Sequence, residues 1–439
     1  MTFFLTSFFV VMVFWRPQEW LVPWLYGFPL LWIVTGLAVV SMAIELNDRK
    51  LRVPSPRRQP QIWLLAGLWF AAMMSHVADF YLAGLLWTIV PTFNLCLFTF
   101  MLFCVLDRPS RLRRMALIFV IMACVMSVHA LMQQRLHYGF AGSRPLFVRA
   151  GYRGPAHTRS LFFGIFGDPN DLAQILVTAL PLSFAIFRRK STMRTLVSCA
   201  LAGLILMGIF TTHSRGGQLA LAFSLAIMAL LVLPARWLPW LLFALTLTAL
   251  LFTPLAAGYL DRSAVDRLDF WGQANWVFKS RPIFGVGYGM FTDYISGARA
   301  AHNAFVLCYT ELGLFGYWFW FTLILLACLG AWRARAAVVK PETVEQAWLK
   351  RYAGLSVAAL SGFLVSSYFL TRAFVYPLFF LIAMLGVLPR LAEDMKPDLT
   401  RPLINPRRDV GLYGTIGSLG SVLYIYWSII LLNRIAYGL

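Results

Sequence analysis

The chain has 439 residues, of which 60% are hydrophobic, 16% are aromatic and 13% are charged. This charged fraction is about half of the roughly 25% typical of soluble domains, which excludes a disordered chain and argues against a soluble globular protein. The formal net charge is +20, but the basic residues lie mostly in short loops between apolar runs, where they set membrane orientation. The composition therefore predicts an integral membrane protein with membrane lipids, and no nucleic acid, as partners.

Long continuous apolar runs recur along the chain, which favours membrane-spanning helices over a β-barrel with alternating hydrophobicity. A helix needs about 20 apolar residues to cross a bilayer. The predicted spans are residues 2–15, 24–45, 61–76, 84–106, 114–132, 171–187, 193–212, 218–234, 237–256, 303–331, 352–371, 374–389 and 411–433. We therefore expect an all-α polytopic membrane protein with about 12–13 transmembrane helices, organised as a single integral membrane domain over residues 1–439.

The loops between these spans divide by charge. One alternate set, residues 46–60, 107–114, 188–194, 235–236, 332–351 and 390–410, holds 24 of the 38 Lys and Arg residues. Because positively charged loops stay in the cytoplasm, this set and the amino terminus are predicted to lie inside. Two long loops, residues 133–170 and 257–302, then lie outside.

Both long outer loops are more basic than orientation requires. Each carries five basic residues: Arg135, Arg144, Arg149, Arg153 and Arg159 in the first, and Arg262, Arg267, Lys279, Arg281 and Arg299 in the second. Guanidinium groups hold phosphate in a fixed fork, so an anionic ligand at the outer face would explain them. Contact with lipid headgroups, or pairing with Asp261, Asp266, Asp269 and Asp293, explains the charges equally well.

Cysteine and histidine patterns give no metal site. The sequence has neither a CxxC pair nor an HExxH pattern, and its six cysteines lie in or at the ends of apolar stretches. We therefore expect no disulfide framework, no metal and no cofactor.

The second long loop carries the most distinctive pattern. It contains Arg267-Leu-Asp-Phe-Trp271, then Arg281-Pro-Ile-Phe-Gly285-Val-Gly287-Tyr-Gly289, and it ends at Ala301-His302-Asn303. The glycines allow tight turns and close backbone approach to a ligand. His302 would lie at the outer mouth of a helix and could take a proton from a hydroxyl near neutral pH, although a lone histidine is more often structural. Asn303 could cap the helix or orient His302.

The helix that follows contains Glu311-Leu-Gly313-Leu-Phe-Gly316. A carboxylate within a span is a functional candidate by default, and an interhelical hydrogen bond is the structural alternative. Gly313 and Gly316 are expected to serve close helix packing.

Two further patterns lie at helix ends. Thr211-Thr-His213-Ser-Arg215-Gly-Gly217 forms an outer turn, where Arg215 could meet a lipid diphosphate or act equally well as a snorkelling anchor. Gly167-Asp168-Pro-Asn170-Asp171 predicts a turn and a helix start whose free amides could bind an anion. For Asn170, helix capping is the simpler interpretation. Arg372, between two spans on the outer side, is a further candidate cation.

Taken together and in this order, these motifs resemble the O-antigen ligase and Wzy-type polymerase superfamily, over roughly residues 60–390. The shared features are Ser-Arg-Gly-Gly after a span, Arg-x-x-x-Trp, the Pro-x-x-Gly-x-Gly-x-Gly turn, His-Asn and Glu-x-Gly-x-x-Gly. The Gly-x-Phe-Gly-Asp-Pro-Asn-Asp-Leu-Ala stretch is similar to a segment that precedes the middle spans in that family. The last span, 411–433, is additional to the usual arrangement of that family.

The resemblance implies a metal-independent membrane glycosyltransferase of GT-C type in the bacterial inner membrane. Its donor would be an undecaprenyl-diphosphate-linked glycan, used at the periplasmic face with a lipid or saccharide acceptor. His302 would match the family's essential histidine, and Arg215 and Arg267 its essential arginines, with Arg262 as an alternative to Arg267. Arg159, Asn170, Arg281, Gly285, Gly287, Asn303 and Arg372 are the predicted substrate-binding residues. A transporter or flippase of lipid-linked saccharides, a protein O-oligosaccharyltransferase and a noncatalytic scaffold remain the alternatives.

Overall fold

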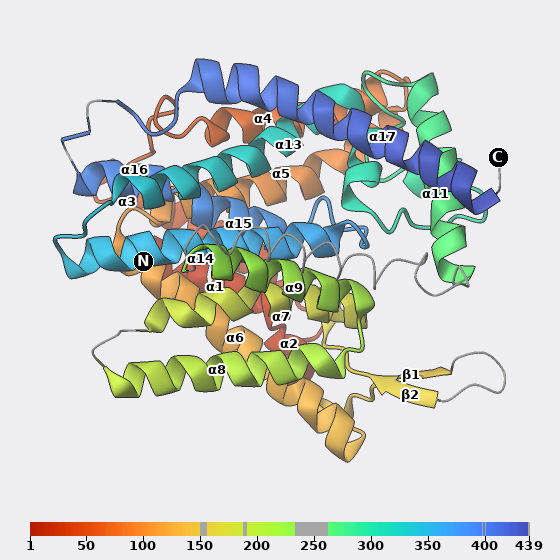
Figure 1. Ribbon diagram of the computed structural model, residues 1–439. Coiled ribbons are helices and arrows are strands. Elements are labelled where there is room, and N and C mark those ends of the chain that lie inside the picture. Colours follow the sequence, from red (N-terminus) through yellow and green to blue (C-terminus); the bar gives the residue numbers. More distant parts are fainter. Residues whose placement is uncertain (150–155, 188–190, 233–261, 397, 400, 438–439) are drawn as a thin grey trace. The chain divides into compact units, whose positions relative to one another are not determined.

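The computed structural model describes residues 1–149, 156–187, 191–232, 262–396, 398–399 and 401–437 (Figure 1). Helices dominate these residues, and the described strands form one two-stranded hairpin. Six of the described helices are long and apolar enough to cross a membrane, namely α3, α5, α6, α8, α13 and α17 with its π-helical start, and several shorter apolar helices accompany them. The predicted all-α polytopic fold is confirmed.

The chain divides into two units. Unit 1 comprises Met1–Val53, Cys104–Leu245 and Val338–Ser366, and unit 2 comprises Pro54–Phe103, Thr246–Ala337 and Ser367–Leu439. The helices and strands of unit 1 are α1 (Thr2–Phe14), α2 (Pro17–Trp20), α3 (Leu30–Asn47), α6 (Pro109–Leu136), β1 (Leu146–Arg149), β2 (Ala156–Arg159), α7 (Pro169–Ser183), α8 (Thr192–Thr211), α9 (Arg215–Leu230) and α14 (Val344–Ser367). Those of unit 2 are α4 (Gln61–Val77), α5 (Leu82–Val105), α11 (Arg262–Ser280), α12 (Phe291–Tyr294), α13 (Ala304–Ala337), α15 (Tyr376–Gly386), α16 (Leu388–Met395), the π-helix η7 (Pro406–Gly414) and α17 (Thr415–Tyr437).

Most predicted spans correspond to single helices. Residues 84–106 and 193–212, for example, match α5 and α8 to within two residues at each end. The predicted span 374–389 instead forms two helices, α15 and α16, and Pro389 lies in the first turn of the second, where its missing N–H is tolerated. The predicted span 237–256 lies outside the described residues.

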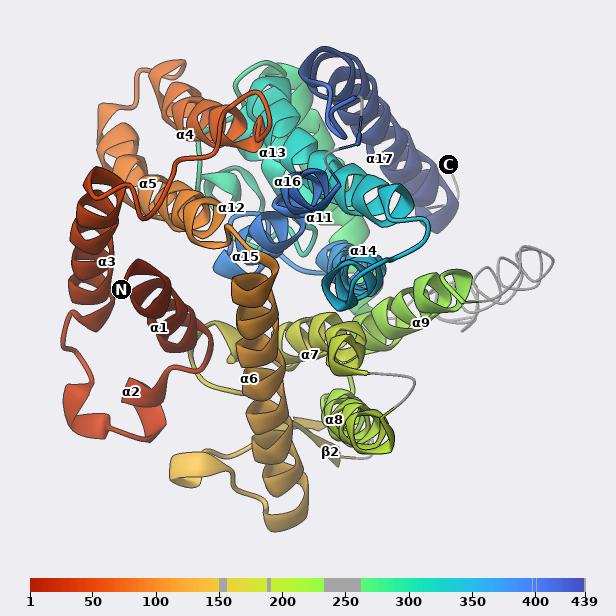
Figure 2. The ribbon, with the colours of Figure 1, turned by 90° about the vertical axis from the view of Figure 1, so that its left-hand side faces the viewer.

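Helix α7 forms the centre of unit 1. It packs against α6, α8 and α9 (Figure 2), and every one of its residues except Asn170 is buried. A helix that is buried on every side lies in the core, and α7 holds that place in unit 1. Asn170 is thus the one α7 residue that lies at the border of the core.

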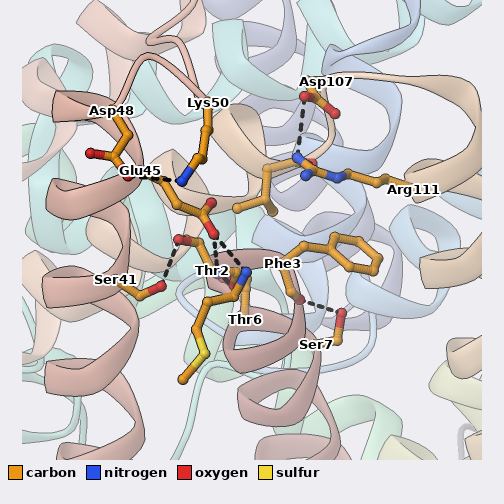
Figure 3. A network of polar contacts seen from close by, with 12 residues as sticks. Thr2, Phe3, Thr6, Ser7, Ser41, Glu45, Asp48, Lys50, Asp107 and Arg111 are labelled. Atoms are coloured by element: carbon orange, nitrogen blue, oxygen red, sulfur yellow. Dashed lines mark hydrogen bonds and ion pairs between the residues drawn. The ribbon is translucent and has the colours of Figure 1, made fainter.

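One end of unit 1 gathers positive groups (Figure 3). The amino group of Met1 lies 2.6 Å from Glu45 at the end of α3, and Lys50 lies 2.9 Å from Asp48. The guanidinium of Arg111, near the start of α6, lies 5.7 Å from the ring centre of Phe3. The amino terminus, residues 45–50 and the start of α6 therefore lie at the same end of unit 1, as expected of segments predicted to share one side of a membrane.

Helix α13 forms the centre of unit 2 and packs against α4, α11, α15, α16 and α17. It is not continuous: Gly313 has φ +62° and ψ −169°, which no helix accommodates. The prediction that Gly313 serves helix packing is therefore wrong, because this glycine interrupts the helix. A Cβ at Gly313 would lie 2.2 Å from the carbonyl oxygen of Ile283, so only glycine fits.

The glycine loop, defined here as residues 281–290, fills this interruption. The amides of Val286 and Gly287 donate to the carbonyls of Thr310 and Glu311 over 3.1 and 3.0 Å. On the far side of the break, the amides of Leu314 and Phe315 donate to the carbonyls of Pro282 and Ile283 over 2.8 and 3.0 Å. The loop thereby replaces two helix hydrogen bonds. Such substitution is required wherever a membrane helix is broken, since lipid offers no hydrogen-bond partner.

Candidate functional site

The two long loops, residues 133–170 and 257–302, both contain helices or strands among their described residues. The first contains the hairpin of β1 and β2, in which Phe147 pairs with Thr158 and Val148 with His157. The second contains helix α11, which begins at Arg262, and the short α12. Hydropathy patterns do not reveal the hairpin, α11 or α12, because each of them is polar or short.

In unit 1, strand β2 packs against the turn between α8 and α9. The amide of Ser160 donates to the carbonyl of Thr211 over 3.1 Å. Gln134, near the end of α6, donates to the carbonyls of Thr158 and Thr211 over 3.0 and 3.1 Å. This places Arg159, at the end of β2, beside the Ser-Arg-Gly-Gly motif.

Asn170 connects Arg159 to that motif. Its carbonyl oxygen accepts hydrogen bonds from Arg159 Nη2 over 2.9 Å and from Ser214 Oγ over 2.7 Å. Asp168, not Asn170, caps α7, since its side chain accepts the Asn170 amide over 2.7 Å. The simpler interpretation of Asn170 as a helix cap is therefore wrong, although the predicted helix start is confirmed. Ser214 caps α9 by accepting the amide of Gly217 over 3.1 Å.

We call His157, Arg159, Asn170, His213 and Ser214 the Arg159 cluster. Its two imidazole rings lie close together, with the ring centres of His157 and His213 separated by 5.6 Å. Burial lowers the pKa of Arg159, while the negative charge of Asp168 acts in the opposite direction. Burial also lowers the pKa of His213, and the positive charges of His157 and Arg159 add to this effect.

Arg215 is the first residue of α9, directly after the Arg159 cluster, and it is exposed. The structure thus brings together three predicted residues of unit 1, namely Arg159, Asn170 and Arg215. Among the described residues, no carboxylate pairs with Arg159, whose remaining bond is from Nε to the carbonyl of Thr212 over 2.9 Å. A cationic surface beside the positive end of a 16-residue helix favours a negatively charged ligand.

In unit 2, His302 lies directly before α13 and is exposed. Asn303 caps this helix, since its carbonyl oxygen accepts the amides of Phe305 and Val306 over 2.9 and 3.1 Å. The predicted capping role of Asn303 is therefore confirmed.

The Arg-x-x-x-Trp motif lies on α11. Arg267 and Trp271 are one helical turn apart and so share a face of the helix. Trp271 is buried, and its indole N–H donates to the carbonyl of Ala301, next to His302, over 2.6 Å. This bond connects the motif to the residue before His302. The backbone amide of His302 donates to Thr371 over 2.9 Å, and Thr371 directly precedes the predicted cation Arg372 in the chain.

Three more predicted residues of unit 2, Arg281, Gly285 and Gly287, lie against other parts of the protein. Arg281 forms an ion pair with Asp79, after the end of α4. A Cβ at Gly285 would lie 2.4 Å from the backbone of Glu311, and one at Gly287 would lie 2.8 Å from the ring of His76. The close approach expected of these two glycines is thus to α13 and α4, and their contact with substrate stays a prediction.

Glu311 is buried and accepts the amide of Phe291 over 3.3 Å. It therefore joins the residues after the glycine loop to α13, which is the hydrogen-bonding alternative considered for it. Sequence patterns did not reveal Thr371 or Asp79, since neither belongs to a motif. A serine directly before a helix is a recognised capping signal, so Ser214 could have been found.

Arg215 belongs to unit 1, whereas Arg267 and His302 belong to unit 2. Their convergence on one ligand stays a prediction. Within the described residues, no three His, Cys, Asp or Glu side chains are grouped so that they could hold a metal ion.

Comparison with known proteins gives one family. Residues 197–321 match the family model described as O-Antigen ligase. The matched segment contains Arg215, Arg267, Arg281, Gly285, Gly287, His302 and Asn303, and it excludes Arg159, Asn170 and Arg372. No curated protein matches the chain. The family match confirms the predicted resemblance over residues 197–321 and supports a ligase- or polymerase-type role for this multi-pass membrane protein.

Proposed function

We propose that the protein transfers a glycan from an undecaprenyl-diphosphate carrier to an acceptor hydroxyl at the periplasmic face of the bacterial inner membrane. The observation that carries this proposal is that one segment, residues 197–321, matches the O-antigen ligase family model and contains Arg215, Arg267 and His302. The acceptor is a lipid or a growing saccharide, which makes the enzyme a ligase or a polysaccharide polymerase.

Arg215 and Arg267 hold the diphosphate of the donor in this mechanism. Both side chains keep a positive charge at any physiological pH, so they stabilise the negative charge that develops on the departing diphosphate. Arg215 is suited to this because it begins α9, where the helix dipole adds positive potential. Arg159 and Asn170, which lie within the same hydrogen-bonded cluster, position the donor beside it.

His302 acts as the general base. Its imidazole takes the proton of the acceptor hydroxyl, whose oxygen attacks the anomeric carbon. The bond between that carbon and the diphosphate oxygen breaks, and the carrier leaves as undecaprenyl diphosphate. His302 then gives its proton to water. Exposure of His302 at the mouth of α13 supports this role, since both acceptor and water can reach it. Arg281, Gly285, Gly287, Asn303 and Arg372 shape the surrounding surface.

The test is a transfer assay with purified protein in lipid nanodiscs and an undecaprenyl-diphosphate-linked oligosaccharide. Released undecaprenyl diphosphate and the glycosylated product are both identified by mass spectrometry. His302→Ala is expected to lose about 100-fold or more in kcat, the usual contribution of a general base. Arg215→Ala and Arg267→Ala are expected to fall by a similar factor.

Arg299→Ala provides the matched control, because this exposed arginine lies three residues before His302 and belongs to no predicted site. It is expected to keep full activity. Full activity of His302→Ala, or loss of wild-type activity in EDTA, contradicts the mechanism. Movement of labelled lipid across the membrane without bond formation supports a flippase instead.

A further inference from the structure

The backbone of His302 is held in an unusual conformation. Its φ is +45°, in the left-handed region that residues with a side chain rarely adopt. Such a conformation costs free energy and persists only where surrounding contacts determine it. The contacts of His302 and its neighbours therefore identify what holds the backbone in this conformation.

Two side chains hold the chain at this point. Thr371, in the connection between α14 and α15, accepts the backbone amide of His302 on its Oγ1 over 2.9 Å. Trp271, on α11, donates its indole N–H to the carbonyl of Ala301 over 2.6 Å. Together they hold the C=O and the N–H of the single peptide group that joins Ala301 to His302. Asn303 then fixes the start of α13 directly afterwards.

We propose that Trp271 and Thr371 are positioning residues that keep His302 in its left-handed conformation, so that the imidazole points out of the helix mouth toward the acceptor. This inference rests on the proposed role of His302 as general base. It also explains the spacing of the Arg-x-x-x-Trp motif: the same turn of α11 that carries Arg267 carries the indole that holds His302. One rigid helix thus sets the positions of a diphosphate-binding cation and the base.

Trp271 is well suited to fix a position. Its side chain is only 5% exposed, and its ring contacts Tyr368 edge to face, with ring centres 5.7 Å apart. Tyr368 lies three residues before Thr371, so Trp271 contacts the same connection that carries Thr371.

The experiment compares Thr371→Val, Thr371→Ser and Trp271→Phe in the donor-transfer assay. Thr371→Val removes the acceptor oxygen at nearly constant volume, whereas Thr371→Ser retains it. A misplacement of about 1 Å in a catalytic group is expected to lower kcat by about 100-fold. We therefore expect kcat to fall strongly in Thr371→Val and Trp271→Phe, with the donor KM unchanged, and to be restored in Thr371→Ser.

Trp69→Phe is the matched control, because Trp69 also donates its indole N–H to a backbone carbonyl, that of Ile89, over 3.1 Å. It is expected to keep its kcat. Wild-type kcat in Thr371→Val, or an equal loss of kcat in Trp69→Phe, overturns the inference.

A second measurement reports on His302 without relying on activity. Diethyl pyrocarbonate modifies exposed imidazoles, and mass spectrometry gives the rate at each histidine over a range of pH. In Thr371→Val, the rate at His302 is expected to change while that at His157 stays constant, and an unchanged His302 rate contradicts the inference. If His302→Ala retains full transfer activity, the proposed function fails instead, and the modification rates still decide whether Thr371 holds His302.

Discussion

The carbonyl oxygen of Asn170 lies 2.7 Å from the hydroxyl of Ser214, and this contact joins the first turn of α7 to the cap of α9. The two residues are 44 positions apart in the sequence. Because the same oxygen also accepts from Arg159, one carboxamide bonds both to the first long loop and to the Ser-Arg-Gly-Gly turn.

Replacement of Asn170 tests this role. Asn170→Ala removes the acceptor that Arg159 and Ser214 share, so we expect a loss of about 1–2 kcal/mol in stability, seen as a lower Tm. Asn170→Asp keeps an oxygen in place and is expected to retain the wild-type Tm. Its added negative charge beside Arg159 is expected to raise the donor KM. Equal Tm values for Asn170→Ala and the wild type would show that the contact contributes nothing.

The glycine loop offers a matched pair of substitutions. Gly285 and Gly289 both have positive φ, at +73° and +77°, so alanine costs about 1–2 kcal/mol of backbone strain at either position. A Cβ at Gly285 would also collide with the backbone of Glu311, whereas nothing lies within 4 Å of a Cβ at Gly289. We expect Gly285→Ala to lower the Tm and the yield of folded protein far more than Gly289→Ala. Similar values for the two variants would contradict the close packing of the loop into α13.

The lowered pKa of His213 predicts a pH dependence. An unfolded histidine titrates near about 6.5, and burial together with the charges of His157 and Arg159 holds the folded value below that. The unfolded state therefore binds more protons, so the stabilisation is complete above about pH 6.5 and is lost as the pH falls below it. Hydrogen exchange of residues 156–160 and 211–214, after correction for the slower intrinsic exchange at low pH, is expected to accelerate on acidification.

His213→Gln is the control for this effect. Glutamine carries no charge at any of these pH values, so exchange in the variant is expected to depend less on pH beyond its intrinsic chemical rate. The same acceleration in His213→Gln as in the wild type would assign the pH dependence to another group.

Membrane orientation can be tested with two single cysteines. Ser55 and Ser296 are both exposed, and they lie in loops predicted to be cytoplasmic and periplasmic, respectively. In cells with a permeabilised outer membrane, an impermeant maleimide is expected to label Ser296→Cys at once, and Ser55→Cys only after lysis. The reverse pattern would place the proposed site on the cytoplasmic side and exclude a periplasmic reaction.

Hydropathy predicts the helices of this protein well because a membrane-spanning helix needs apolar side chains, which is what hydropathy measures. The predicted spans 84–106 and 193–212 match helices closely, since each is one uninterrupted apolar run. The break in α13 escaped prediction for the same reason: Gly313 lies within an apolar run, and its partner, the glycine loop, is about 30 positions earlier in the chain. Averaging over a window cannot show that a distant segment supplies the missing hydrogen bonds.

The sequence indicated some residues of the candidate site and missed others. His302, Arg215 and Arg267 came from motifs, and Asn303 was correctly expected to cap a helix. Thr371 and Asp79 were missed, because a residue that acts through one long-range contact leaves no local pattern. The role of Asn170 differs from the one that its neighbours suggested, since Asp168 is the better cap at the preceding position.

The break at Gly313 divides α13 into two segments with different contacts. Beyond Gly313, the helix runs on to Arg333, which donates from Nη2 to the buried Asp409 of η7 over 3.1 Å. Before Gly313, a segment of little more than two turns carries His302. Bilayers differ in thickness, and long helices respond by tilting. Because the glycine loop is hydrogen-bonded to α13 on both sides of the break, a change of tilt beyond Gly313 is expected to act on residues 281–290 as well as on the segment that follows His302.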